Sequence, residues 1–182
     1  EEGVMIDHKD NLSGDDSRVI MDRVVPFVRE NVKKSQPFFA YIAFHTPHTP
    51  TISGGKYLEM YSNEEGRHHY GAITAMDEQI GRLMKVLEST GQEENTLVWF
   101  CTDNGAAKTV PRFFEYGGFG SNKPFRGWKG QLYEGGIRVP GILVFPAMFS
   151  KPSVITMPCV TSDMFPTIMS ILGDTNFKTS LP

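Results

Sequence analysis

Three short apolar runs, separated by longer segments of helical periodicity, constrain the fold of this chain most strongly. The runs cover residues 37–44, 96–102 and 141–145. Continuous apolar runs of this length, bounded by proline, glycine or polar turn residues, are typical of strands buried inside a sheet. We therefore expect three strands, of which residues 37–44 form a central parallel strand buried on both faces.

The segments around these runs predict helices. Apolar residues recur at three- and four-residue steps over residues 14–34 and 64–89, and residues 162–173 begin with cap-type residues and end on glycine. Pro26 predicts that the first helix is kinked or in two pieces. Gly91 should end the second helix. Alternating strands and helices predict the α/β class, with a right-handed crossover between the first two strands.

Size and composition bound the possibilities further. With 182 residues, 40% of them hydrophobic, the chain can bury one sizeable core, so we expect a single domain over residues 1–182. The net charge is −3 and the basic residues are scattered, so neither nucleic acid nor a membrane surface is expected as a partner. No apolar run approaches the ~20 residues of a membrane span, and no leader pattern gives a location.

Three polar clusters are candidates for a functional site, and the first is Asp103–Asn104. It directly follows the predicted strand 96–102. A carboxylate and an amide oxygen are hard donors, suited to Ca²⁺ or Mg²⁺. Asp-Asn-Gly is also an ordinary turn sequence, so this pair alone does not decide between a metal site and a simple turn.

The second cluster, residues 45–50, follows the predicted strand 37–44 and has the sequence His-Thr-Pro-His-Thr-Pro. Its two prolines stiffen the loop and could hold His45 and His48 outward. The imidazoles could bind zinc, or one could donate a hydrogen bond to an anionic substrate and assist proton transfer. A rigid surface loop with solvated histidines is an equally good interpretation of these residues alone.

The third cluster, residues 126–136, is rich in glycine and contains Lys129, a mobile positive charge suited to an oxyanion. It could equally be a solvated loop. It lies within residues 106–136, a stretch without clear periodicity. A loop this long in a compact domain is usually functional, so we expect substrate contacts there.

The order of these clusters is more specific than any one of them. Residues 38–50, 102–105 and 126–140, together with Asp-Met-Phe-Pro-Thr at 163–167, resemble the second half of the type I sulfatase domain of the alkaline phosphatase superfamily. The arylsulfatase and N-acetylgalactosamine-6-sulfatase types are the most similar. The resemblance implies an alkaline-phosphatase-like sandwich with a mostly parallel central sheet flanked by helices. It also implies a partial catalytic domain that lacks its N-terminal half.

The resemblance also implies roles for individual residues. Asp103 and Asn104 match the later pair of ligands that holds the family's Ca²⁺. His48, or less well His45, matches a histidine that contacts the sulfate ester. Lys129 matches a lysine that binds a sulfate oxygen and helps to protonate the leaving alcohol. The implied substrate is a sulfated carbohydrate or an aryl sulfate.

The family's nucleophile has no counterpart in this sequence. It is a formylglycine hydrate made within a Cys/Ser-x-Pro/Ala-x-Arg motif, which neither Cys101 nor Cys159 matches. The pair Asp15–Asp16 precedes a predicted helix, so we assign it to helix capping rather than to the family's N-terminal metal ligands. By itself the chain is therefore expected to supply only half of the calcium site and to have little activity.

Other interpretations stay open at this point. A phosphodiesterase or phosphonate hydrolase of the same superfamily commonly has histidine after the metal-binding aspartate, and Asn104 disfavours that class. A non-catalytic module that binds sulfated glycans would keep the same loops. Unpaired sheet edges could support a homodimer. The family is compatible with periplasmic, extracellular and lysosomal locations, and the sequence does not choose among them.

Overall fold

The computed structural model describes residues 15–108 and 117–174; Gly14 and part of the long loop 106–136 lie outside these ranges. The chain divides into two compact units, residues 1–149 and 150–182, so the single domain stays a prediction. The first unit contains α1 (Ser17–Lys33), α2 (Gly55–Met60), α3 (Arg67–Ser89), β1 (Val98–Cys101), α4 (Glu134–Ile137) and β2 (Gly141–Val144). The second contains η3 (Thr161–Asp163) and α5 (Met164–Ile171).

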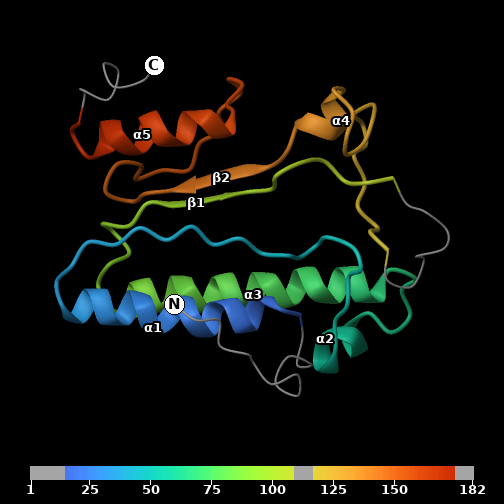
Figure 1. The fold of residues 1–182 in the computed structure, drawn as a ribbon, viewed down its shortest axis with the longest axis horizontal. Helices are drawn as coiled ribbons and strands as arrows, with labels where there is room; N and C mark the ends of the chain where they lie inside the picture. The colour runs from blue at the N-terminus through green and yellow to red at the C-terminus, as the bar shows by residue number, and fades with distance from the viewer. Residues whose placement is uncertain (1–14, 109–116, 175–182) are drawn as a thin grey trace, which may run out of the picture. The chain divides into compact units, whose positions relative to one another are not determined.

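The main hydrophobic core lies between α1 and α3, which run side by side (Figure 1). Buried apolar residues on α1 recur at steps of four and three residues: Met21, Val25 and Val28. On α3 they are Leu83, Val86 and Leu87. Burying one such side chain contributes roughly 1.5–3 kcal/mol. This periodicity explains why both segments are helical and why they pack together.

Both long helices confirm their predictions, with one difference. α1 is a single continuous helix although Pro26 lies inside it, so the alternative of two pieces is wrong. Gly91 has a left-handed φ of 68°, and the amide of Gln92 donates to the carbonyl of Leu87 (2.8 Å). A glycine in this conformation ends a helix at low cost, as predicted.

Residues 37–44 differ from the predicted central strand. They are not assigned to a strand, and they run as a trace along α1 and α3 (Figure 1). Phe38, Ile42 and Phe44 pack on the core, whereas Phe39 and Tyr41 are 73% and 85% exposed. The segment therefore buries one face against the helices. A strand also needs a neighbour for its backbone hydrogen bonds, and within the described residues β1 pairs with β2 alone.

β1 and β2 occupy two of the predicted strand positions, and they pair antiparallel rather than parallel. The register runs from Val98 opposite Val144 to Cys101 opposite Gly141. A parallel pair needs a crossover, usually a helix, whereas α4, the one helix described between these strands, is a single short turn. The chain consequently returns beside β1 in the opposite direction, and the described segments 102–108 and 117–140, which include α4, lie between the two strands in the sequence.

The described residues also contain α2 in the first unit and η3 with α5 in the second. α2, which the sequence did not predict, follows the His-Thr-Pro loop and contacts α3. In the second unit, the predicted helix over 162–173 is η3 followed by α5, and Gly173 has a φ of 79° after its last turn. Among the residues described, no helix combines the length and apolarity that crossing a membrane requires.

Candidate active site

The loop that follows β1 and the loop that leads into α4 are joined along their backbones. The amide of Gly105 donates to the carbonyl of Gly136 (3.0 Å), and the amide of Lys129 donates to the carbonyl of Ala106 (3.0 Å). The first loop carries the predicted metal ligands, and the second carries the predicted sulfate-binding lysine. The structure thus brings Asp103–Asn104 and Lys129 onto adjoining segments, although they are more than twenty positions apart in the sequence.

Glycine makes this close approach possible. A Cβ atom at Gly105 would lie 1.9 Å from the carbonyl oxygen of Gly135, and one at Gly135 would lie 2.3 Å from the carbonyl oxygen of Gly127. Both distances are far below any real contact, so no other residue fits at either position without moving the backbone. Gly105 therefore allows the two loops to stack against each other, whereas Gly135 allows the loop 126–136 to fold closely on itself.

Lys129 is only partly exposed, and its backbone is fixed while its ammonium is available. Among residues 15–108 and 117–174, the ammonium group of Lys129 forms no ion pair. Neighbouring cations are engaged by aromatic rings: Arg126 lies over Tyr133 (4.0 Å to the ring centre) and Lys108 lies over Trp128 (5.1 Å). An unpaired ammonium on an ordered backbone is suited to an anionic substrate.

The donor set of Asp103 and Asn104 fits a hard cation. The side-chain nitrogen of Asn104 donates to the carbonyl of Gly105 (3.0 Å), which leaves Oδ1 as the oxygen available to a metal. Asp103 is exposed and adds a carboxylate. Ca²⁺ takes six to eight oxygen ligands. Nowhere in the described part of the chain do three or more His, Cys, Asp or Glu residues form a metal site, so these two residues would be part of a larger ligand set.

His45 and His48 lie together on the loop after residues 37–44. Their ring centres are 5.5 Å apart, and the amide of His48 donates to the carbonyl of His45 (2.8 Å). Nδ1 of His48 lies 2.7 Å from the carbonyl oxygen of Thr49. Since a carbonyl can only accept, Nδ1 carries the proton and Nε2 is the nitrogen available to a substrate. A Cβ atom at Gly118 would lie 3.8 Å from the methyl carbon of Thr49, so this loop passes close to Gly118.

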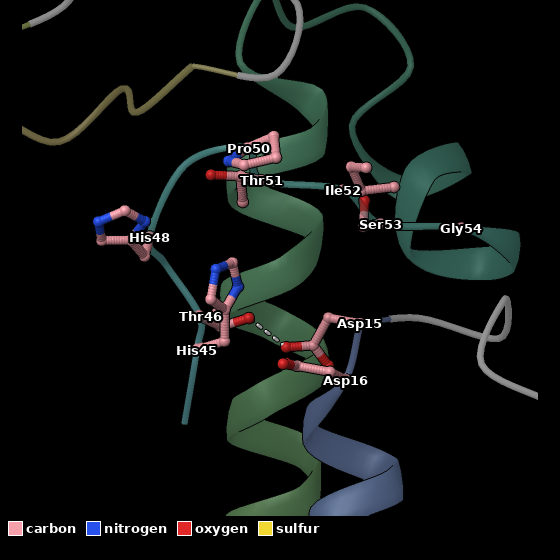
Figure 2. A pocket seen from close by; sticks show the side chains of 10 residues that line it. All are labelled: Asp15, Asp16, His45, Thr46, His48, Pro50, Thr51, Ile52, Ser53 and Gly54. Atoms are coloured by element: carbon pink, nitrogen blue, oxygen red, sulfur yellow. Dashed lines mark hydrogen bonds between the residues drawn. The ribbon is translucent and has the colours of Figure 1, made fainter. Parts of the chain in front are cut away.

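The His-Thr-Pro loop is also tied to the start of α1, by a contact that the sequence did not predict (Figure 2). The buried carboxylate of Asp15 accepts hydrogen bonds from the hydroxyl of Thr46 and from the amide (3.1 Å) and hydroxyl (2.6 Å) of Ser17. Asp16, the residue at the N-cap, makes no capping hydrogen bond. The capping assignment is therefore correct for Asp15 only, and Asp15 has a second partner 31 residues away.

An open pocket of about 370 Å³ lies between α1 and this loop (Figure 2), and it is lined by Asp15, Asp16, His45, Thr46, His48, Pro50, Thr51, Ile52, Ser53 and Gly54. Burial and the neighbouring carboxylate of Asp15 raise the pKa of Asp16, while His45 opposes that rise. The pocket is acidic on one wall and carries imidazoles on the other.

Sequence reasoning missed two residues at this site, Asp15 and Asn122. Asn122 lies in Ser-Asn-Lys-Pro, a run of ordinary turn residues. Its side chain bridges the two stacked loops through the backbone of Ala106 and Gly127. The sequence offered no signal for either residue beyond turn or cap propensity, because both act through partners that are distant or defined only by the fold.

Comparisons with known proteins agree with this arrangement. The Sulfatase family model matches residues 5–174. A sulfatase from Formosa agariphila is 34% identical over 168 residues, covering 84% of this chain and 29% of that protein. N-acetylgalactosamine-6-sulfatase from Rattus norvegicus is 30% identical over 159 residues, covering 86% and 29%. The solved structure of Ps i-CgsB in complex with k-i-k-neocarrahexaose has a TM-score of 0.75 at 28% identity, covering 87% of this chain and 34% of that one.

The family match and the structural similarity define a chain of the α/β class. The chain belongs to the sulfatase family, whose members are generally metal-dependent. The predicted α/β class is confirmed by the structural similarity to Ps i-CgsB. The chain spans less than a third of the length of the two curated relatives.

Proposed function

We propose that this chain forms part of the active site of an enzyme that hydrolyses sulfate esters of carbohydrates or aryl alcohols. The observation that supports this most directly is the backbone pairing of the loop 103–106 with the loop 126–136. This pairing sets the carboxylate of Asp103 and the amide of Asn104, which could bind a cation, on a segment beside that of Lys129, which forms no ion pair with any other residue that the structure describes. Positive charge from two sources around one anion is what transfer of a sulfuryl group requires.

Lys129 binds a sulfate oxygen in this proposal. Its ammonium neutralises negative charge on the sulfate oxygens, and as the bond between sulfur and the ester oxygen breaks it can donate a proton to the departing alkoxide, where negative charge develops. The donated proton neutralises the alkoxide, so the product leaves as an uncharged alcohol. The electron pair of the broken bond stays on that oxygen, and the sulfuryl group passes to the nucleophile.

Asp103 and Asn104 would hold the metal, which we propose to be Ca²⁺ because both supply hard oxygen ligands. The bound ion would act as a Lewis acid on the sulfate oxygens. By the family resemblance, the remaining ligands and a formylglycine nucleophile would come from residues that this sequence does not contain.

His48 contacts the ester in this proposal, through Nε2. The hydrogen bond from Nδ1 to the carbonyl of Thr49 fixes the ring and its tautomer. When the ring is neutral, Nε2 can accept a hydrogen bond; when it is protonated, Nε2 can donate one to the ester oxygen or the sulfate. His45, whose ring lies beside that of His48, is the second candidate for substrate contact.

The test measures sulfate release by the complete natural polypeptide that contains this sequence, with and without Ca²⁺. The substrates are a sulfated oligosaccharide, a chromogenic aryl sulfate and a phosphate diester. We expect Ca²⁺-dependent release from a sulfate ester and its loss in Lys129→Ala. Hydrolysis of the phosphate diester alone would favour the phosphodiesterase class. Binding of the sulfated oligosaccharide without any release would favour the binding module.

A further inference from the structure

Asn122 connects the two loops of the candidate site through three hydrogen bonds. The amide of Ala106 donates to Oδ1 of Asn122 (2.7 Å). Nδ2 of Asn122 donates to the carbonyl of Ala106 (2.9 Å) and to the carbonyl of Gly127 (3.2 Å). One partly buried side chain thus contacts the segment after the metal ligands and the segment before Lys129 at the same time.

The partners determine how the Asn122 amide is oriented. Ala106 offers both a donor and an acceptor to the same side chain, so Oδ1 must face its amide and Nδ2 must face its carbonyl. The carbonyl of Ala106 also accepts from the amide of Lys129 (3.0 Å), so its two lone pairs are both used. The backbone of Ala106 is therefore shared between Asn122 and Lys129.

Asn122 is itself held in place. The amide of Phe125 donates to the carbonyl of Asn122 (2.8 Å), which closes a turn between Asn122 and the segment that enters the loop 126–136. A Cβ atom at Gly105 would lie 3.1 Å from Oδ1 of Asn122, so the side chain also fills the space beside the first loop. An ordered side chain with every polar atom paired gives a defined spacing between the two loops.

We propose that Asn122 is a positioning residue that sets Lys129 relative to Asp103 and Asn104, and through them relative to the metal. This inference rests on the proposed function. The hydrogen bonds of its side chain that the structure describes go to the backbone of Ala106 and Gly127, so Asn122 acts through these two segments. Only an amide of this length supplies the required donor and acceptor from one side chain.

Two substitutions of Asn122 separate the effect of its hydrogen bonds from the effect of its shape. Asn122→Asp has the same shape and keeps an acceptor for the amide of Ala106, but it loses both donations and sets a carboxylate oxygen against two carbonyls. Asn122→Ala loses all three bonds. Asn31→Ala is the matched control, because Nδ2 of Asn31 also donates to a backbone carbonyl, that of Phe27 (2.8 Å), on the exposed face of α1.

The first measurement is amide hydrogen exchange, which does not depend on activity. We expect exchange to rise at Ala106 and Lys129 in Asn122→Ala and at Lys129 in Asn122→Asp, while the amides of α1 and α3 keep their protection. The control should leave both loops unchanged. Unaltered exchange at Ala106 and Lys129 in Asn122→Ala would overturn the inference, whether or not the chain is a sulfatase.

The second measurement uses the complete natural polypeptide and follows sulfate release against substrate and against Ca²⁺. A positioning role predicts a rise of roughly 10- to 100-fold in the Ca²⁺ concentration for half-maximal rate or in KM. A merely structural role would lower the maximal rate alone, in proportion to the folded fraction. Wild-type protein without sulfatase activity would defeat the proposed function, whereas active wild type with unchanged variants would defeat this inference only.

Discussion

The two regions of the first unit are held together by different forces. The helices α1 and α3 pack through buried aliphatic side chains such as Met21 and Leu87, both at most 2% exposed. The loops of the candidate site pack through backbone hydrogen bonds, stacked glycines and one asparagine. Apolar packing tolerates small shifts but gives stability, whereas directional bonds give little net stability but define positions. Stability and function are thus largely separable in this chain.

The largest effect on folding should come from the helix pair. Leu87→Ala removes a side chain that is 2% exposed, so we expect unfolding to cost about 2–5 kcal/mol less. The urea-unfolding midpoint measures this. Leu132→Ala, at a position that is 92% exposed in the site loop, is the control and should change stability by less than about 0.5 kcal/mol. If both variants lost a similar amount of stability, the helix pair would not be the main source of stability in comparison with the site loops.

The converse effect should come from the site loops. Lys129→Ala removes an ammonium that no carboxylate pairs among the described residues, so we expect kcat/KM to fall by about 100- to 1,000-fold, with an unchanged urea midpoint. The assay is sulfate release by the complete natural polypeptide. Lys123→Ala, an exposed lysine of the same loop, is the control and should stay near wild type. A large loss of stability in Lys129→Ala would show that the loop is structural.

One residue should affect both regions. Asp15→Ala leaves the hydroxyl of Thr46 and both donors of Ser17 without their acceptor, so we expect a loss of about 1–3 kcal/mol in stability. It should also lower activity, because Thr46 lies in the loop that carries His48. Asp16→Ala removes a carboxylate without a capping bond and should change stability little. If Asp15→Ala lowered stability but kept full activity, Asp15 would not act on His48 through this loop.

The smallest effect concerns pH and the α3 helix. Burial lowers the pKa of His69, whose Nδ1 has no hydrogen-bond partner among the residues that the structure describes. The unfolded chain therefore binds this proton more readily, so stability is complete above pH 6.5 and falls below it, by at most about 1.4 kcal/mol per pH unit. In His69→Leu, the urea-unfolding midpoint should change less between pH 7.5 and pH 5.5 than it does in wild type. If the urea midpoint changed equally with pH in wild type and in His69→Leu, the loss of stability in acid would come from other groups.

Local signals explain what the sequence predicted correctly. α1 and α3 follow their apolar periodicity, α3 and α5 are followed by the glycines that were expected to end them, and β1 and β2 fall on two of the three apolar runs. The family is confirmed as well, because the resemblance rests on short motifs, whereas the roles of the residues in the three clusters stay predictions. What a residue contacts within its own segment was therefore largely accessible from the sequence.

Long-range pairing explains what the sequence could not predict. An apolar run does not reveal its neighbour, so neither the antiparallel pairing of β1 with β2 nor the one-sided packing of residues 37–44 was foreseen. The bond from Thr46 to Asp15 joins residues 31 positions apart. Asn122 bridges two loops whose stacking depends on Gly105. Each of these contacts depends on tertiary structure rather than on local propensity.

The most direct test of a sulfatase site built on Asp103, Asn104 and Lys129 is the Ca²⁺ dependence of sulfate release by the complete natural polypeptide. We expect Asp103→Ala to raise the Ca²⁺ concentration for half-maximal rate by at least about tenfold, with activity partly restored at high Ca²⁺. Wild-type release that is indifferent to removal of Ca²⁺, or an unchanged half-maximal concentration in Asp103→Ala, would contradict the proposed site.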